Sequence, residues 1–318
     1  MNRRLTRLVR LVVTLGLLVA LSWFIWRNWD QIASVSLDQP WLLAAAGVLV
    51  LANSVATGEG TQAVIAPHGV RLTFSELFGL AVLTRFSNQI LPNYVGAAIR
   101  ASYLKRSHSV TYASFSSSFV VSNVIMLLVT GALAVVSFIL MGADVSALES
   151  LVFAGVTVAV LSAALAFLPA TWLANQLTKI TAGPRIGRFT DRVIDMLTSY
   201  STIRRSRGAL LRCIAWTLIA VGLLILIYLA LFSSLGAATD PIGIVFIAML
   251  TNWSMVFAIT PAGIGIRESI MFLAASIAGV AVGPTVVVAL LLRVVSIIAT
   301  GLPSLFYLKA LPGHAPSR

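Results

Sequence analysis

The segment Ile259–Glu268 reads Ile-Thr-Pro-Ala-Gly-Ile-Gly-Ile-Arg-Glu and interrupts an otherwise apolar part of the chain. Residues 242–259 before it and residues 269–282 after it are almost wholly apolar. Proline removes a backbone donor and glycine loosens the backbone, so the helix expected on either side breaks here. Irregular backbone at membrane depth must be buried in protein or line a wet cavity, because hydrocarbon cannot satisfy its polar groups. The adjacent charges of Arg267 and Glu268 therefore indicate a functional site.

The composition predicts an all-α polytopic membrane protein formed by a single membrane domain over residues 1–318. Of the 318 residues, 59% are hydrophobic and only 10% are charged, and the mean hydropathy of +0.98 excludes an ordinary soluble domain. The net charge of +12 comes from dispersed cations, which are typical of cytoplasmic loops rather than of a nucleic-acid surface. Cys213 is the single cysteine and the three histidines lie far apart, so we expect neither a metal site nor a cofactor.

Hydropathy predicts about six full transmembrane helices of the length needed to cross a bilayer. The basic residues before the first apolar run and Lys309 after the last one place both termini in the cytoplasm of a bacterial inner membrane. The apolar runs lie at residues 11–26, 41–57, 110–141, 151–168, 213–235 and 285–307.

Residues 170–212 form the longest polar segment and carry eight cations against two anions. That excess predicts a cytoplasmic basic loop. Between Arg188 and Ile203, apolar residues recur at spacings of three and four, which predicts an amphipathic helix. We favour a basic surface lying against anionic headgroups over a specific recognition site.

Residues 74–104 contain two half-helices joined by a break at Pro92–Gly96. Arg71 precedes the pair and Lys105 follows it, so both ends are expected on the cytoplasmic side, as in a re-entrant hairpin. The alternative is a pair of amphipathic helices lying on the inner leaflet. A second re-entrant or broken-helix hairpin, over residues 241–283, is expected to enter from the outer side.

The two breaks are alike, since each places a proline, a glycine-loosened turn and an arginine at the start of a half-helix. The first reads Pro-x-x-x-Gly-x-x-x-Arg over Pro92–Arg100, and the second reads Pro-x-Gly-x-Gly-x-Arg-Glu over Pro261–Glu268. This pattern predicts structural breaks at Pro92, Gly96 and Pro261. It also predicts inverted-topology repeats with halves of about 1–169 and 170–318.

At these residues the chain resembles the transmembrane region of the lysylphosphatidylglycerol synthase/flippase family. The family pattern is Asn-x-x-Leu-Pro-Gly-x-Gly-Gly-x-x-Arg in the first half and Pro-Gly-Gly-x-Gly-x-Arg-Glu with a later arginine in the second. The matching residues are Asn88, Leu91, Pro92, Gly96 and Arg100, then Pro261, Gly263, Gly265, Arg267, Glu268 and Arg293. Asn93, Ala97 and Ala262 depart from it where the family has glycine, which bears on loop shape. The resemblance implies a lipid-translocating or lipid-binding membrane module; we expect no soluble aminoacyl-transferase domain after Lys309, and so no lysyl-lipid synthesis.

The second break has the chemistry of an anion site. Backbone N–H groups freed at Gly263 and Gly265 would lie at a half-helix start, where the helix dipole favours anions. Arg267 adds a planar donor fork suited to phosphate. Arg100 is expected to converge on it from the opposite hairpin near mid-membrane, with Glu268 pairing one arginine when the site is empty. Further candidates for headgroup binding are Arg85, Arg293 and Asn88.

Three functions are compatible with this arrangement. We expect a lipid flippase or translocator, not an enzyme, that binds an anionic phospholipid or polyprenyl-phosphate headgroup in a mid-membrane cavity. The alternatives are a membrane-embedded lipid-modifying or glycosyl-transferring enzyme, for which clustered acids are lacking, and an accessory subunit of a lipid-synthesis enzyme. A fixed ion-pair network holding the two hairpins together is the structural alternative. Candidate partners are the membrane lipid, a lipid-synthesis enzyme and a second copy of the chain.

Overall fold

The computed structural model describes residues 26, 29–33, 35–91, 95–142, 184–237, 240–254, 263 and 265–310. Within these ranges every regular element is a helix. The helices are α2 (Trp29–Ala33), α3 (Trp41–Ile65), the short 3-10 helix η1 (Ala66–His68), α4 (Phe74–Ile90), α5 (Val95–His108), α6 (Tyr112–Leu140), α9 (Pro184–Arg205), α10 (Arg207–Ser234), α11 (Pro241–Trp253), α12 (Ile266–Ile277) and α13 (Val282–Ala310).

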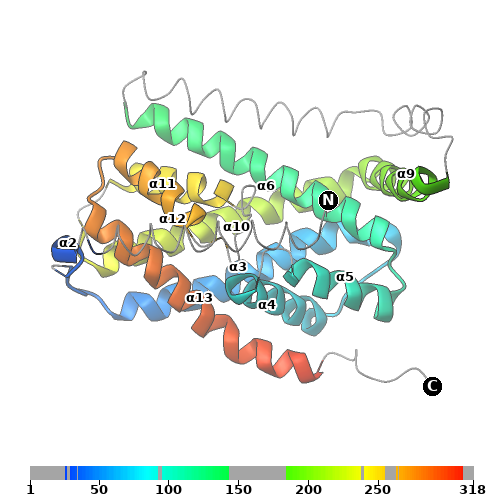
Figure 1. Cartoon of the computed structure of the whole chain (residues 1–318), viewed down its shortest axis with the longest axis horizontal. Coiled ribbons are helices and arrows are strands. Elements are labelled where there is room, and N and C mark those ends of the chain that lie inside the picture. The colour runs from blue at the N-terminus through cyan, green and yellow to red at the C-terminus, as the bar shows by residue number, and fades with distance from the viewer. Residues whose placement is uncertain are drawn as a thin grey trace.

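Among the described residues, four helical segments are long and apolar enough to cross a membrane, and α3, α6 and α10 run along the long axis of the molecule (Figure 1). They confirm four of the six predicted spans. Residues 11–25 of the first predicted run and the whole run at 151–168 lie outside the described residues. The four segments are Trp41–His68, Tyr112–Leu140, Arg207–Ser234 and Val282–Leu308.

Helix α3 continues past its predicted end near Thr57 because its polar side chains find partners. Thr61 accepts a hydrogen bond from Arg100 at 3.0 Å. Gln62 donates to the Val70 carbonyl at 3.0 Å and accepts from the Leu72 N–H at 3.4 Å, which ties the following loop to the helix. Polar groups that hydropathy treats as the end of a span are thus satisfied inside the fold.

Helices α3 and α10 pack along much of their length, and small residues permit the close approach. A Cβ added at Gly60 would lie 3.7 Å from the Trp216 Cβ and 4.0 Å from the Cys213 carbonyl. Near the middle of the pair, Asn53 donates a 2.6 Å hydrogen bond to the Ala220 carbonyl. The two helices therefore form the central pair of the bundle.

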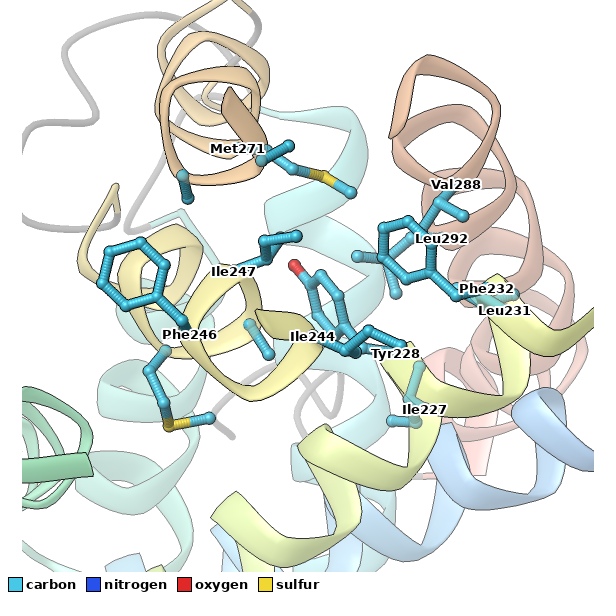
Figure 2. Close-up of a cluster of buried hydrophobic side chains, with 14 of the residues drawn as sticks. Ile227, Tyr228, Leu231, Phe232, Ile244, Phe246, Ile247, Met271, Val288 and Leu292 are labelled. Carbon is cyan, nitrogen blue, oxygen red and sulfur yellow. The ribbon is translucent and has the colours of Figure 1, made fainter. Parts of the chain in front are cut away.

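A buried apolar cluster joins this pair to the second half of the chain (Figure 2). Tyr228 and Phe232 of α10 lie against Ile247 of α11, Met271 of α12 and Leu292 of α13, and all five are 2% exposed or less. Burial of large apolar side chains is the main stabilising contribution within a protein core. The cluster fixes α12 against α13, and so positions the charged residues beside it.

The first broken-helix pair is a hairpin whose two ends lie together. The Glu76 carboxylate, near the start of α4, accepts from the Tyr103 hydroxyl at 2.6 Å and bonds His108 Nε2 at 2.8 Å, near the end of α5. At the break, the Gly96 N–H donates to Asn88 Oδ1 at 3.2 Å. A Cβ at Gly96 would lie only 2.4 Å from the Thr84 carbonyl, so this crossing requires glycine.

The second pair consists of α11 and α12, which contact each other. Trp253 at the end of α11 donates to Thr130 of α6 at 3.0 Å, and its ring lies over Gly131. Each half of the chain thus contains a long helix, a hairpin and a second long helix in the same order: α3, α4–α5, α6 and α10, α11–α12, α13. The two predicted halves and the inverted repeat both stay predictions.

The predicted amphipathic helix between Arg188 and Ile203 is present as α9. Its apolar face does not lie only against headgroups: Ile203 is fully buried in a cluster with Val64 of α3, Val121 of α6 and Cys213 of α10. Helix α9 therefore closes one end of the bundle.

The two ends of the bundle carry opposite charge. Arg71 and Arg212 border one cavity at the end where α9 meets η1. At the other end, the Gln39 N–H donates to the Ser234 carbonyl at 3.1 Å, which brings Asp38 and Asp240 to the same end. Among the described residues, the molecule is therefore basic at one end and acidic at the other.

Candidate functional site

Glu268 is the buried acid of the second break and uses both of its carboxylate oxygens. Its side chain folds back onto the start of α12, where Oε2 accepts the Gly265 N–H at 2.8 Å. Its Oε1 accepts Arg293 Nη2 of α13 at 2.5 Å. Both Gly263 and Gly265 have positive φ, 65° and 86°, a conformation that favours glycine. The expected pairing of Glu268 with an arginine is confirmed, and the partner is Arg293.

Arg85 of α4 lies at the same site but bonds a neutral group. Its Nη1 donates to Asn53 Oδ1 of α3 at 2.5 Å. Its Nε is buried and has no hydrogen-bond partner in the part of the chain that the structure describes. Arg267 of α12 lies close enough to Arg85 to repel it electrostatically, and Tyr228 of α10 also interacts with Arg85.

This group of residues, which we call the arginine cluster (Arg85, Arg267, Arg293 and Glu268), lies at mid-depth. Arg293 is near the middle of the candidate span Val282–Leu308. Asn53, which Arg85 contacts, is near the middle of the span Trp41–His68, and its partner Ala220 is near the middle of the span Arg207–Ser234. Three independent spans therefore assign the arginine cluster to the centre of the bundle's height.

The arginine cluster has an excess of positive charge. Three guanidinium groups share one carboxylate, so two positive charges have no carboxylate partner among the described residues. The Arg267 backbone N–H donates to the Gly263 carbonyl at 3.2 Å, but its guanidinium forms no hydrogen bond or ion pair with the residues that the structure describes. Because an uncompensated charge in a low-dielectric site is costly, such a group is typical of a site that binds an anion.

Arg100 of α5, which we expected beside Arg267, contacts a different part of α3. Its Nη1 donates to Thr61 at 3.0 Å, whereas Arg85 contacts Asn53. These two positions on α3 are separated by two helical turns, about 12 Å along the axis at 1.5 Å per residue. The structure therefore brings Arg85, and not Arg100, within electrostatic range of Arg267. The buried Nε of Arg100 has no partner within the described ranges.

Among the other predicted site residues, Asn88 and Gly96 are hydrogen-bonded to each other across the first break. The Asn88 side chain thus accepts a hydrogen bond from the backbone of its own hairpin. Pro92 and Pro261 lie outside the described residues.

Asn53 belongs to the site but is not among the predicted site residues, although the sequence carries one signal for it. Asn53 stands in an apolar run, four and eight residues before Thr57 and Thr61, so the three share one face of α3. Within the described part of the chain, no group of three histidine, cysteine, aspartate or glutamate side chains could hold a metal ion.

The helices, their apolarity and the buried charges define a multi-pass α-helical membrane protein. A family model described as the lysylphosphatidylglycerol synthase TM region matches residues 7–304. The chain belongs to this family, which confirms the resemblance over nearly its whole length. Neither the curated proteins nor the solved structures contain a match to it.

Proposed function

We propose that this protein translocates a membrane lipid by binding its anionic phosphate headgroup at the arginine cluster. The observation that carries the proposal is that Arg267 and Arg85 lie within electrostatic range of each other at mid-depth, where only Glu268 supplies a compensating charge among the described residues. A phosphate between the two guanidinium groups would replace their repulsion by charge-assisted hydrogen bonds. Moving a phosphate across hydrocarbon requires such fixed partners.

A lipid fits this site better than a soluble anion because the arginine cluster adjoins a lipid-facing surface. Leu290, Val294, Ile298 and Leu302 recur every four residues on α13 and are 46–77% exposed. Arg293 lies directly beside this stripe and its side chain keeps 19% exposure. Acyl chains could remain in the bilayer along α13 while the headgroup occupies the arginine cluster.

Glu268 and Arg293 would form the permanent part of the site. Both Glu268 oxygens are bound, one by Gly265 and one by Arg293, so the carboxylate is held away from an incoming phosphate. Arg267 and the free donors of Arg85 would make the contacts that change on binding. A fixed ion-pair network accounts for Arg293 with Glu268, but not for two further arginines that repel each other electrostatically.

The proposed orientation follows from charge. We assign the basic end, with Arg71, Arg212 and α9, to the cytoplasm of a bacterial inner membrane, because cytoplasmic loops carry the excess of lysine and arginine. The hairpin α4–α5 would then enter from the cytoplasmic side and α11–α12 from the outer side. Both termini would be cytoplasmic.

The test is lipid movement in liposomes that contain the purified protein. A fluorescent phospholipid is bleached from outside, and the protected fraction reports translocation. We expect Arg267→Ala and Arg85→Ala to abolish the protein-dependent rate, with helicity and thermal unfolding close to wild type for Arg267→Ala. Arg205→Ala, an exposed arginine at the basic end, is the matched control and should translocate normally.

Translocation at the wild-type rate by folded Arg267→Ala would overturn the assignment of the arginine cluster. Translocation by Arg100→Ala then tests whether the headgroup also passes Arg100, which contacts α3 about two turns from the contact of Arg85. Recovery of the labelled lipid in a covalently changed form would instead favour the lipid-modifying enzyme.

A further inference from the structure

A cavity of about 560 Å³ opens at the basic end of the bundle. Its residues Glu59 and Gln62 lie about 9–14 Å along α3 from Asn53, which contacts Arg85 of the arginine cluster. The volume of the cavity is within the range of small-ligand sites. The end of α3, the helix η1, the loop that follows it and the start of α10 form its walls. The lining residues used below are Glu59, Gln62, Arg71, Arg212 and Trp216.

The cavity carries charges of both signs that do not neutralise each other. Glu59 is half-buried, whereas Arg71 and Arg212 are exposed at the rim. In the described part of the chain no ion pair joins Glu59 to either arginine. An acid and two cations that share a cavity without pairing offer separate positions for the cation and the anion of one ligand.

The walls of the cavity are held by contacts that need no ligand. Gln62 bonds the backbone of Val70 and Leu72, which fixes the loop carrying Arg71. Arg212 Nε donates to the Gly208 carbonyl at 3.2 Å, which leaves its two terminal nitrogens available. Such pre-formed walls lower the cost of ordering a ligand.

The outer surface of α10 indicates where the ligand comes from. Leu211 and Leu218 are 66% and 53% exposed, and they flank the part of α10 that carries Arg212 and Trp216. Since α10 is long and apolar enough to cross a membrane, we infer that this exposed apolar surface faces lipid. A molecule anchored in the bilayer beside α10 can therefore place its headgroup in the cavity.

We propose that this cavity binds a phospholipid headgroup that carries both a phosphate and a primary ammonium. The phosphate contacts Arg71 and Arg212, and the ammonium contacts Glu59, with the Trp216 ring beside it. The inference rests on the proposed function in one respect: the cavity would be the site where the lipid is selected before it reaches the arginine cluster. Binding itself requires no translocation.

The experiment measures binding of three probes to the detergent-solubilised full chain by titration calorimetry. They are short-chain dihexanoyl phosphatidylethanolamine, dihexanoyl phosphatidylglycerol, which lacks the ammonium, and soluble phosphoethanolamine, which lacks the acyl chains. We expect the phosphatidylethanolamine to bind most tightly, by about tenfold over each of the others, since a charge-assisted contact or the apolar contact with α10 is missing from each.

Two variants separate the roles of the charges. Glu59→Gln should remove the preference for phosphatidylethanolamine and leave phosphatidylglycerol binding unchanged. Arg212→Gln should weaken both lipids by about tenfold. Arg205→Gln, an exposed arginine that does not line the cavity, is the control and should change neither.

Equal affinity for the two lipids in the wild type, or an unchanged preference in Glu59→Gln, would overturn the proposal. Soluble phosphoethanolamine binding as tightly as the lipid would also overturn it, because the ligand would then not come from the membrane. Arg267→Ala distinguishes this proposal from the proposed function. That variant should keep the full lipid preference in binding even though it fails to translocate.

Discussion

The two hairpins differ in the partners that accompany the buried arginines. In α4–α5, Arg85 and Arg100 each donate to a neutral oxygen on α3, that of Asn53 and that of Thr61. In α11–α12, the break itself supplies a carboxylate, Glu268, which is used by Arg293 of α13. The first hairpin therefore brings positive charge into the bundle without an acid partner there, and the second brings the one acid of the arginine cluster.

The difference indicates that some charged residues of the site stabilise the fold and that others are available to bind a ligand. An ion pair between α12 and α13 holds a helix in place, because both partners are permanent. A guanidinium that bonds only a neutral oxygen keeps its full charge for another partner. We therefore expect loss of the Glu268–Arg293 ion pair to affect stability first, and loss of Arg85 or Arg267, which have no carboxylate partner among the described residues, to affect function first.

The largest effect is expected from Glu268→Ala. It leaves Arg293 buried without a carboxylate, and breaking a buried pair from one side costs about 3–5 kcal/mol. Thermal unfolding in detergent measures the loss. The double variant Glu268→Ala/Arg293→Met should recover much of the stability, since no unpaired charge remains. A double variant as unstable as the single one would show that the loss does not come from the unpaired charge of Arg293.

Gly96→Ala should have the next largest effect, because it tests how tightly the first hairpin closes. The new Cβ would lie 2.4 Å from the Thr84 carbonyl, which the backbone must relieve by separating α4 from α5. We expect a loss of about 1–3 kcal/mol in the free energy of unfolding. Gly222→Ala in α10 is the matched control, with nothing within 4 Å of its new Cβ, and should be neutral or slightly stabilising.

Asn88→Ala should be milder, with a loss of about 1 kcal/mol in the free energy of unfolding. It removes the acceptor of the Gly96 N–H but adds no steric conflict. Translocation measured on the same sample sharpens the comparison between the hairpins. Abolished translocation at nearly wild-type stability would assign Asn88 to the headgroup site rather than to the break.

The smallest effect is a pH dependence at the mouth of the first hairpin, outside the four candidate spans. Burial raises the pKa of Glu76, but hydrogen bonds from Tyr103, from Thr73 and from His108 outweigh it and lower the pKa to about 2. A lowered folded-state pKa stabilises the fold above the ordinary value of 4.5, and this contribution is lost as the pH falls from there toward 2.

Thermal unfolding of the wild type and of Glu76→Gln at pH 6 and pH 3 measures this effect. The wild type should be the more stable of the two at pH 6, and the difference should shrink at pH 3. A difference that stays constant between the two pH values would mean that the charge of Glu76 does not hold the mouth closed.

The elements of this fold could be predicted from the sequence more fully than the contacts within its site. Uninterrupted apolar composition is enough to predict a spanning helix, and the four described spans follow it. The pairing of Glu268 with an arginine was also predictable, because a buried acid needs a cation. Its choice of Arg293 was not, since Arg85, Arg100 and Arg267 were equally available in sequence.

The position of Arg100 was beyond prediction for a related reason. Its neighbours depend on how far the hairpin α4–α5 inserts along α3, and the apolar patterns of the two half-helices do not determine that depth. Asn53 was equally hard to assign, because its role depends on Ala220, which is 167 residues away. Tertiary contacts of this kind decide the site, whereas local composition decides the helices.

Asn53 uses both ends of its amide, donating to the Ala220 carbonyl and accepting from Arg85. An aspartate at this position could neutralise Arg85, but it has no donor for the Ala220 carbonyl and would place a negative charge against it. The central contact of α3 with α10 thus selects against the simplest change that would cancel the positive charge of the arginine cluster. In this bundle, the same residue, Asn53, therefore maintains both the positive charge of the site and the packing of α3 against α10.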